Sequence, residues 1–265
     1  MADDVLKGLP VKQVAEWYGR LAEAWAKNAP GLQPALAAEF LKAWLNNRTP
    51  TATIAFDAPS HLRKSNVVFE TQSYHRDVFL SVKKARLGRK SASVEKWAGL
   101  LPRIQGVPGY PKWDMTTPLG LEYESICDIA PNQLAIGVIQ QVGSAADLDI
   151  LGSLHGFQLK SEVTVGPLTG TGNSRNVAFQ SWTCSGTDRY DWDPSKYMTV
   201  FNPDYGSTEA DAIEPKSEQL TVFHSNARRV EDAKLASPYN VFLRPWPVTD
   251  ARICGPAVID ISRKL

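Results

Sequence analysis

Residues 187–193 place three carboxylates and a tyrosine in one short stretch, Thr-Asp-Arg-Tyr-Asp-Trp-Asp. The stretch follows an alternating segment that is typical of a strand and ends at Gly186. Like charges at close range raise one another's pKa, so crowded carboxylates cost free energy. Such a cluster either hydrates a turn or holds a cation or a proton, and only the second use would be catalytic.

Two histidines stand next to arginines and are the other candidates for chemistry. His224 precedes Ser-Asn-Ala-Arg228-Arg229, where a strand is followed at once by a predicted helix. Helix N-termini bind anions, and arginines on the first turn strengthen that preference. His75 precedes Arg76 within a basic region, where the pair can bind a phosphate or transfer a proton. The alternative in both places is structural, namely ordinary capping and solvated arginines.

Several common kinds of site have no support in the sequence. No G-x-S-x-G elbow surrounds a serine, and no P-loop or G-x-G-x-x-G lies between a strand and a helix. The acidic cluster lacks the glycine and the distal glutamate of an EF-hand loop. Zinc and disulfide frameworks are disfavoured because the cysteines are far apart and odd in number: Cys127, Cys184 and Cys254.

The acidic cluster resembles the core motif of the colicin M family, in which an alternating strand runs into Gly and then Asp-x-Tyr-Asp-aromatic. Asp188, Tyr190 and Asp191 match this pattern residue by residue. The resemblance implies a metal-dependent hydrolase of the lipid-linked peptidoglycan precursor with a β-rich catalytic domain. One departure is that Tyr197-Met198 occupies the position where the family has a His-Arg pair.

The hydrolase hypothesis assigns a role to each candidate residue. Asp188 and Asp191 would bind a divalent metal such as Mg²⁺, which stabilises charge on phosphate oxygens or activates water. Tyr190 would orient the substrate or a proton, and His224 would be the general acid–base group. The phosphate-binding candidates are Arg228, Arg229, His75 and Arg76.

A broader resemblance favours a different function. A helical N-terminus without a signal peptide, a β-rich body and phrases such as Tyr-Asp-Trp-Asp-Pro are similar to uncharacterised bacterial proteins of type VI secretion and polymorphic toxin systems. This resemblance implies a secretion-associated or toxin-system protein that acts by protein–protein binding. Its partner would be a secretion apparatus, a chaperone or an immunity protein. We take this as the leading hypothesis and the antibacterial hydrolase effector as the alternative.

Composition and charge limit the classes of function that the chain can have. The 265-residue chain is 43% hydrophobic and 22% charged, as is usual for a globular protein, and its formal charge of +1 excludes a general polyanion binder. Charge is uneven: residues 61–112 hold eleven bases and three acids, whereas residues 186–218 hold eight acids and three bases. The basic run at 83–90 lacks interleaved aromatic residues, so nucleic-acid binding is disfavoured. No membrane span or secretory signal is evident, so we expect synthesis in the cytoplasm and, for an effector, export without a signal peptide.

The secondary structure predicted around these residues divides the chain into a helical part and a β-rich part. Apolar residues recur at three- and four-residue spacing between 11 and 25, and a second helix is predicted near 34–45. We therefore predict a helical hairpin over 1–48, followed by a mainly antiparallel β-rich domain over 49–265. Strands and helices are segregated rather than alternating, which indicates an α+β fold.

Within the β-rich part, short β-branched runs predict strands at 53–56, 67–69 and 78–82. Three prolines and two glycines make regular structure improbable at 101–113, which is expected to form an ordered loop on the core. The clearest hairpin spans 157–184, and a strand at 220–223 leads into a helix at 226–235. Two further strands are predicted at 239–243 and 257–261.

Overall fold

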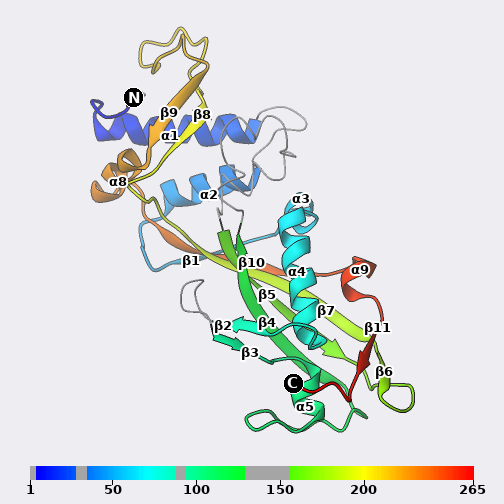
Figure 1. Ribbon diagram of the computed structural model, residues 1–265. Coiled ribbons are helices and arrows are strands. Elements are labelled where there is room, and N and C mark those ends of the chain that lie inside the picture. Colours follow the sequence, from blue (N-terminus) through cyan, green and yellow to red (C-terminus); the bar gives the residue numbers. More distant parts are fainter. Residues whose placement is uncertain (1–3, 28–34, 88–93, 129–155) are drawn as a thin grey trace. The chain divides into compact units, whose positions relative to one another are not determined.

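The computed structural model describes residues 4–27, 35–87, 94–128 and 156–265. These residues form two compact units (Figure 1). The first contains the described part of Met1–Phe56 together with Asp188–Phe242, and the second contains Asp57–Asp128, Gly156–Thr187 and Leu243–Leu265. Helices and mainly antiparallel strands confirm the α+β prediction, while the predicted boundary at residue 48 stays a prediction.

The first unit begins with the predicted hairpin of α1 (Val11–Lys27) and α2 (Ala35–Asn46), whose connection at 28–34 lies outside the described residues. Helix α1 buries one stripe because its apolar residues recur every three or four positions, as in Val14, Trp17 and Leu21. From α2, Phe40 packs on aromatic rings of three strands. The hairpin is therefore packed on the strands of its own unit, as the sequence indicates.

The other elements of the first unit include a two-stranded antiparallel ribbon, β8 (Tyr197–Phe201) and β9 (Gln219–Phe223). Helix α8 (His224–Asp232) follows β9 directly and therefore begins at His224, two residues before the predicted start. The strand β1 (Thr53–Phe56) is the short strand predicted there. The unit also holds the end of β7 (Phe179–Tyr190) and the start of β10 (Tyr239–Pro247).

In the second unit, β4 (Leu119–Asp128), β5 (Gly156–Val165) and β7 form consecutive antiparallel neighbours, which confirms the predicted hairpin. Among the described strands, the order of the five-stranded sheet is β1-β10-β7-β5-β4. Gly186 of β7 is required for packing, because an added Cβ would lie 2.8 Å from Leu243 Cδ1 and 3.1 Å from Phe157 Cδ2. The remaining strands are β2 (Ala85–Leu87) with β3 (Val94–Lys96) and β6 (Ser174–Val177) with β11 (Ala257–Asp260).

The strands predicted at 67–69 and 78–82 are wrong, because both runs fall in or next to helix α4 (Asn66–Phe79). Ser65 caps this helix by accepting a hydrogen bond from Val68 N, and the buried residues Val68, Gln72 and His75 recur at helical spacing. Figure 1 shows α4 lying along strands β4 and β5, which it contacts. A short apolar run alone does not distinguish a strand from a buried helix.

Three short helices complete the second unit: α3 (Ser60–Arg63), α5 (Leu100–Ile104) and α9 (Ala251–Cys254). Helix α5 lies where regular structure was thought improbable, since Pro102 is tolerated in the first turn of a helix. The rest of that passage is irregular and still buries Trp113, whose Nε1 donates to Thr117 O. Strand β10 continues four residues beyond its predicted end at 243.

Candidate functional site

The acidic cluster lies at the end of β7, where side chains alternate between the core and solvent. Tyr190 and Trp192 are buried, while Asp191 and Asp193 are exposed. Asp188 shares the partly buried side of this alternation with Tyr190. The alternation begins in β7, which ends at Tyr190, and the exposed and buried side chains continue to alternate over residues 191–193, so the three carboxylates do not share one environment.

Each exposed carboxylate has a local partner. Asp191 Oδ2 lies 3.9 Å from Arg189 Nε, and both side chains are solvent-exposed. Asp193 Oδ1 accepts hydrogen bonds from Ser195 N at 3.0 Å and Ser195 Oγ at 2.7 Å. These bonds lower the pKa of Asp193 and fold the chain into a turn. Hydration and turn formation, the structural alternative for the cluster, account for both groups.

Asp188 is electrostatically different from its neighbours. Its pKa is raised to about 7, chiefly by burial and in smaller part by the charge of Asp191, while a hydrogen bond from the Arg189 backbone N–H opposes the shift. A carboxyl group with this pKa exchanges its proton near neutral pH, which is the property of a general acid or base. Desolvation alone also produces such a shift in a structural carboxyl group.

Tyr190 belongs to the aromatic core of the first unit. Its ring stacks on Tyr239 with centroids 5.4 Å apart and meets Phe40 edge-on at 5.7 Å. Burial raises the pKa of its hydroxyl above the ordinary value, and the charge of Glu231 adds to the shift. The packing explains why an aromatic residue follows Asp188 at the strand's inward position.

The residues proposed to complete the hydrolase site make structural contacts of their own. The His224 ring packs edge-on against Trp192 at 4.9 Å and is buried as the first residue of α8. Arg228 Nη1 donates to Glu231 Oε2 at 2.6 Å. Arg229 donates to the carbonyl oxygens of Leu6 and Leu9, just before α1. Both arginines thus have protein partners, and their predicted roles in phosphate binding stay predictions.

His75 and Arg76 lie on α4 in the second unit. The His75 ring joins Ser161 Oγ at 2.8 Å and Ser125 Oγ at 2.7 Å, and burial lowers its pKa to about 3. The imidazole is therefore neutral at physiological pH and links α4 to β5 and β4. Arg76 donates to the carbonyls of Ile253, Gly255 and Pro256, which end α9.

Neither a metal centre nor a membrane span is found in the described part of the chain. No group of three or more His, Cys, Asp or Glu side chains in residues 4–27, 35–87, 94–128 and 156–265 is arranged to hold an ion. None of the described helices is long and apolar enough to cross a bilayer. Of the basic run at 83–90, only residues 83–87 are described, and Lys83 Nζ lies 2.9 Å from Asp77 Oδ2.

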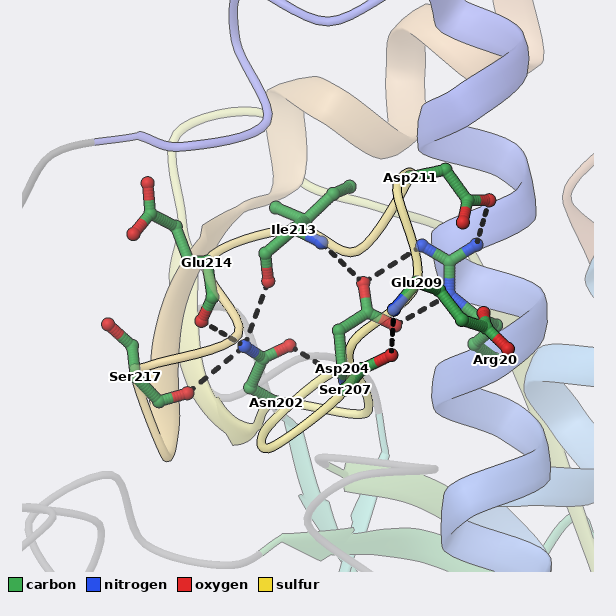
Figure 2. A network of polar contacts seen from close by, with 9 residues as sticks. All are labelled: Arg20, Asn202, Asp204, Ser207, Glu209, Asp211, Ile213, Glu214 and Ser217. Carbon is green, nitrogen blue, oxygen red and sulfur yellow. Dashed lines mark hydrogen bonds and ion pairs between the residues drawn. The ribbon is translucent and has the colours of Figure 1, made fainter.

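A second acidic segment, residues 202–218, is much more organised than the first, and we call it the acidic loop. Figure 2 shows that its centre is Asp204, which accepts from Arg20 Nε at 2.7 Å and from Arg20 Nη2 at 2.9 Å. Asp204 also accepts from Ile213 N at 2.8 Å. Its side chain is 4% exposed, so this bidentate pair is largely shielded from water.

Asn202 completes the fixation of the acidic loop. Its Nδ2 donates to the carbonyl oxygens of Ile213, Glu214 and Ser217, all at 2.9–3.0 Å (Figure 2). Its Oδ1 accepts from Asp204 N at 3.1 Å. The two side chains therefore tie the start of the acidic loop to its end, and Arg20 ties the loop to α1.

The acidic loop and β8 together expose three aromatic rings, which we call the aromatic face. Tyr197, Phe201 and Tyr205 are 60%, 44% and 50% exposed. Phe201 meets Tyr205 edge-on with centroids 6.2 Å apart, and Tyr197 lies 5.6 Å from Phe223 on β9. This surface was not predicted from the sequence, although Tyr-Met-Thr-Val-Phe at 197–201 alternates and Asn202-Pro-Asp-Tyr-Gly is typical of a fixed turn.

The second unit holds an open groove of about 880 Å³ between the start of α4 and the segment that joins β10 to α9. Arg252 lies on one wall, 4.2 Å above the Phe69 ring and paired with Asp250. Arg63 and Lys64 line the groove together with Glu70, so its charges are mixed.

Comparisons with known proteins add no relative: no family model, no curated protein and no solved structure matches the chain. Function must therefore be argued from the residues described above.

Proposed function

We propose that this protein acts by binding another protein, and that the aromatic face is the contact surface. The observation that carries the proposal is a fixed loop presenting exposed rings. Tyr197, Phe201 and Tyr205 are each at least 44% exposed, next to a loop held by Arg20, Asn202 and Asp204. Aromatic side chains are enriched at protein interfaces, where they contribute much of the binding energy.

Preorganisation supports the same proposal. A loop that becomes ordered only on binding loses conformational entropy at that step, and this loss weakens the complex. In the acidic loop the ordering is already provided by the Arg20–Asp204 pair and by the three carbonyl contacts of Asn202. Buried polar contacts of this kind favour one conformation of a surface that would otherwise vary.

The biological setting is proposed from sequence resemblance. We assign the protein to a bacterial secretion or toxin system, with a secretion apparatus, a chaperone or an immunity protein as the partner. A protein exported by such a system needs a surface by which the exporting machinery recognises it. The aromatic face is a suitable surface because it combines apolar area with nearby charge.

Site-specific photocrosslinking tests the proposal. Tyr205→p-benzoylphenylalanine is compared with Val258→p-benzoylphenylalanine, which replaces a 64% exposed residue of β11. In the native host we expect one discrete crosslinked partner from position 205 and none from position 258. Phe201→Ser should reduce that product roughly tenfold if Phe201 contributes as an ordinary interface anchor. Identical products from positions 205 and 258, or no product from position 205, would contradict the proposal.

The hydrolase alternative has one observation in its favour, which is the pKa of Asp188 near 7. It requires toxicity in the compartment where the peptidoglycan precursor is displayed. The parent protein and an Asp188→Ala/Asp191→Ala variant are exported to the periplasm of a test bacterium. Growth arrest by the parent alone supports the hydrolase, whereas equal growth with both proteins removes it.

A further inference from the structure

No other described strand pairs with the outer edge of β8 in the β8–β9 ribbon. His224 N donates to Lys196 O, and Asn202 N donates to Glu218 O, at the two ends of the ladder. In an antiparallel pair, residues that exchange hydrogen bonds alternate with residues that do not. The even-numbered residues of β8 therefore face β9, and the main-chain groups of Tyr197, Thr199 and Phe201 point outward.

These outward groups have no hydrogen-bond partner within the described residues. The same three residues direct their side chains away from the core, since Tyr197 and Phe201 are exposed, whereas Val200 and its neighbour Leu220 are buried. Natural edge strands are usually blocked by proline or charge. On β8 neither device occurs at 197, 199 or 201, so nothing in the part of the chain that the structure describes blocks the backbone or the side chains there.

The charge of the acidic loop, which begins directly after β8, identifies the kind of partner. The exposed ionisable side chains of the acidic loop are four carboxylates and one amine: Glu209, Asp211, Glu214, Glu218 and Lys216. Asp204 is already neutralised by Arg20. A surface with this excess of carboxylates attracts cationic side chains, and exposed tyrosine and phenylalanine rings bind them through cation–π contacts.

We infer that β8 is a docking edge for an extended, basic segment of the partner, which adds to the ribbon as a third strand. Main-chain hydrogen bonds to Tyr197, Thr199 and Phe201 supply affinity, and lysine or arginine at alternate positions meets the aromatic face and the acidic loop. The inference rests on the proposed function, because it specifies how the aromatic face is used.

The first test uses synthetic peptides and the unmodified protein. An eight-residue peptide of alternating Lys and Val is compared with a Glu–Val peptide and with a Lys–Val peptide N-methylated at every second amide. Amide hydrogen exchange is followed by NMR at residues 197, 199 and 201. We expect exchange at these amides to slow roughly tenfold with saturating Lys–Val peptide and to stay unchanged with the other two. Unchanged exchange with the Lys–Val peptide at millimolar concentration overturns the inference.

The second test uses matched variants of the two ribbon edges. Thr199→Pro removes an N–H that the ladder with β9 does not use, and Thr221→Pro makes the same change on the outer edge of β9. Thr199→Pro should weaken Lys–Val binding about tenfold, the loss expected for one or two main-chain hydrogen bonds, while Thr221→Pro leaves it unchanged. Equal affinities for the two variants overturn strand addition.

The outcomes also separate this inference from the proposed function. If Phe201→Ser abolishes the photocrosslinked product but Thr199→Pro does not, the aromatic face binds the partner without strand addition. If neither change has an effect, both proposals fail. A dimer in analytical ultracentrifugation that Thr199→Pro dissociates would show a second copy on the β8 edge and would overturn the basic partner.

Discussion

Residues 188–193 and the acidic loop at 202–218 belong to the same unit, and both are rich in carboxylates. Their carboxylates nevertheless lie in different environments. In the first segment, strand alternation separates the acids: Asp191 and Asp193 face solvent, and Asp188 is partly buried. In the acidic loop, Asp204 is buried against the partly exposed Arg20, which lies 184 residues away in the sequence. Crowding in the sequence therefore does not measure crowding in space.

The difference shows how the partners of a carboxylate compensate for its burial. Asp204 has a bidentate cation and a backbone N–H within 2.9 Å, so its burial is compensated. Among the described residues no cation offsets the burial of Asp188, and its pKa is raised to about 7. The first arrangement fixes a loop, and the second creates a group that changes its charge near neutral pH.

The largest effect is expected from removing the charge of Asp188. Its raised pKa means that the native state holds a proton that the unfolded state releases, so stability is greatest below about pH 4 and falls as the pH rises to about 7. Asp188→Asn abolishes this loss. The variant should be more stable than the parent by up to about 4 kcal/mol at pH 8 and nearly equal at pH 4, as measured by urea unfolding.

Asp193→Asn is the control of opposite sign. Hydrogen bonds from Ser195 lower the pKa of Asp193, so its contribution to stability is present above its ordinary pKa and is lost as the pH falls through the lowered one. The variant should be less stable than the parent at pH 7, and the difference should shrink at pH 3. A parallel pH dependence of the two variants would show that burial of Asp188 does not distinguish it from Asp193.

Much of the fold follows from local sequence signals. The spacing of Val14, Trp17 and Leu21 predicts α1, and the alternation over 157–184 predicts β5 and β7, because each pattern extends over several turns or pairs. Helix α4 was missed because Val67 and Val68 are β-branched, and its helical period becomes visible only when the buried polar residues Gln72 and His75 are counted. Tertiary contacts explain that burial, from His75 to Ser161 and Ser125 and from Gln72 to Cys184, and local patterns do not contain them.

The second prediction tests the fixation of the acidic loop. Asp204→Ala leaves the partly buried Arg20 guanidinium and the Ile213 N–H without their acceptor. The free energy of unfolding should fall by about 3 kcal/mol, the range found when one partner of a buried ion pair is removed. Asp211→Ala is the control, because Asp211 is 61% exposed and 3.9 Å from Arg20, and it should change stability by less than about 0.5 kcal/mol. Equal losses would mean that the pair does not fix the loop.

The candidate site was less predictable than the fold, for a physical reason. Asp188, Tyr190 and Asp191 stand out because they are adjacent in sequence, but adjacency on a strand places successive side chains on opposite faces. The contact between Arg20 and Asp204 joins α1 to a loop near the other end of the chain, and no spacing rule connects them. The aromatic alternation of Tyr197 and Phe201 is a local signal, like the turn sequence after it, and it becomes informative once burial of Val200 shows which face is covered.

The smallest effect on stability is expected at Asp191, for which the binding and the hydrolase hypotheses predict different responses to Mg²⁺. Its side chain is 55% exposed and 3.9 Å from an exposed arginine, so Asp191→Ala should change the free energy of unfolding by no more than about 0.5 kcal/mol.

Adding Mg²⁺ distinguishes a metal ligand from a solvated carboxylate. An ion bound to the native state at one hundred times its dissociation constant would stabilise the protein by about 2.7 kcal/mol. We expect the parent and Asp191→Ala to show the same Mg²⁺ dependence of the melting temperature. A Mg²⁺-dependent rise of several degrees in the melting temperature of the parent alone would show that Asp191 is a metal ligand and would support a catalytic role for the acidic cluster.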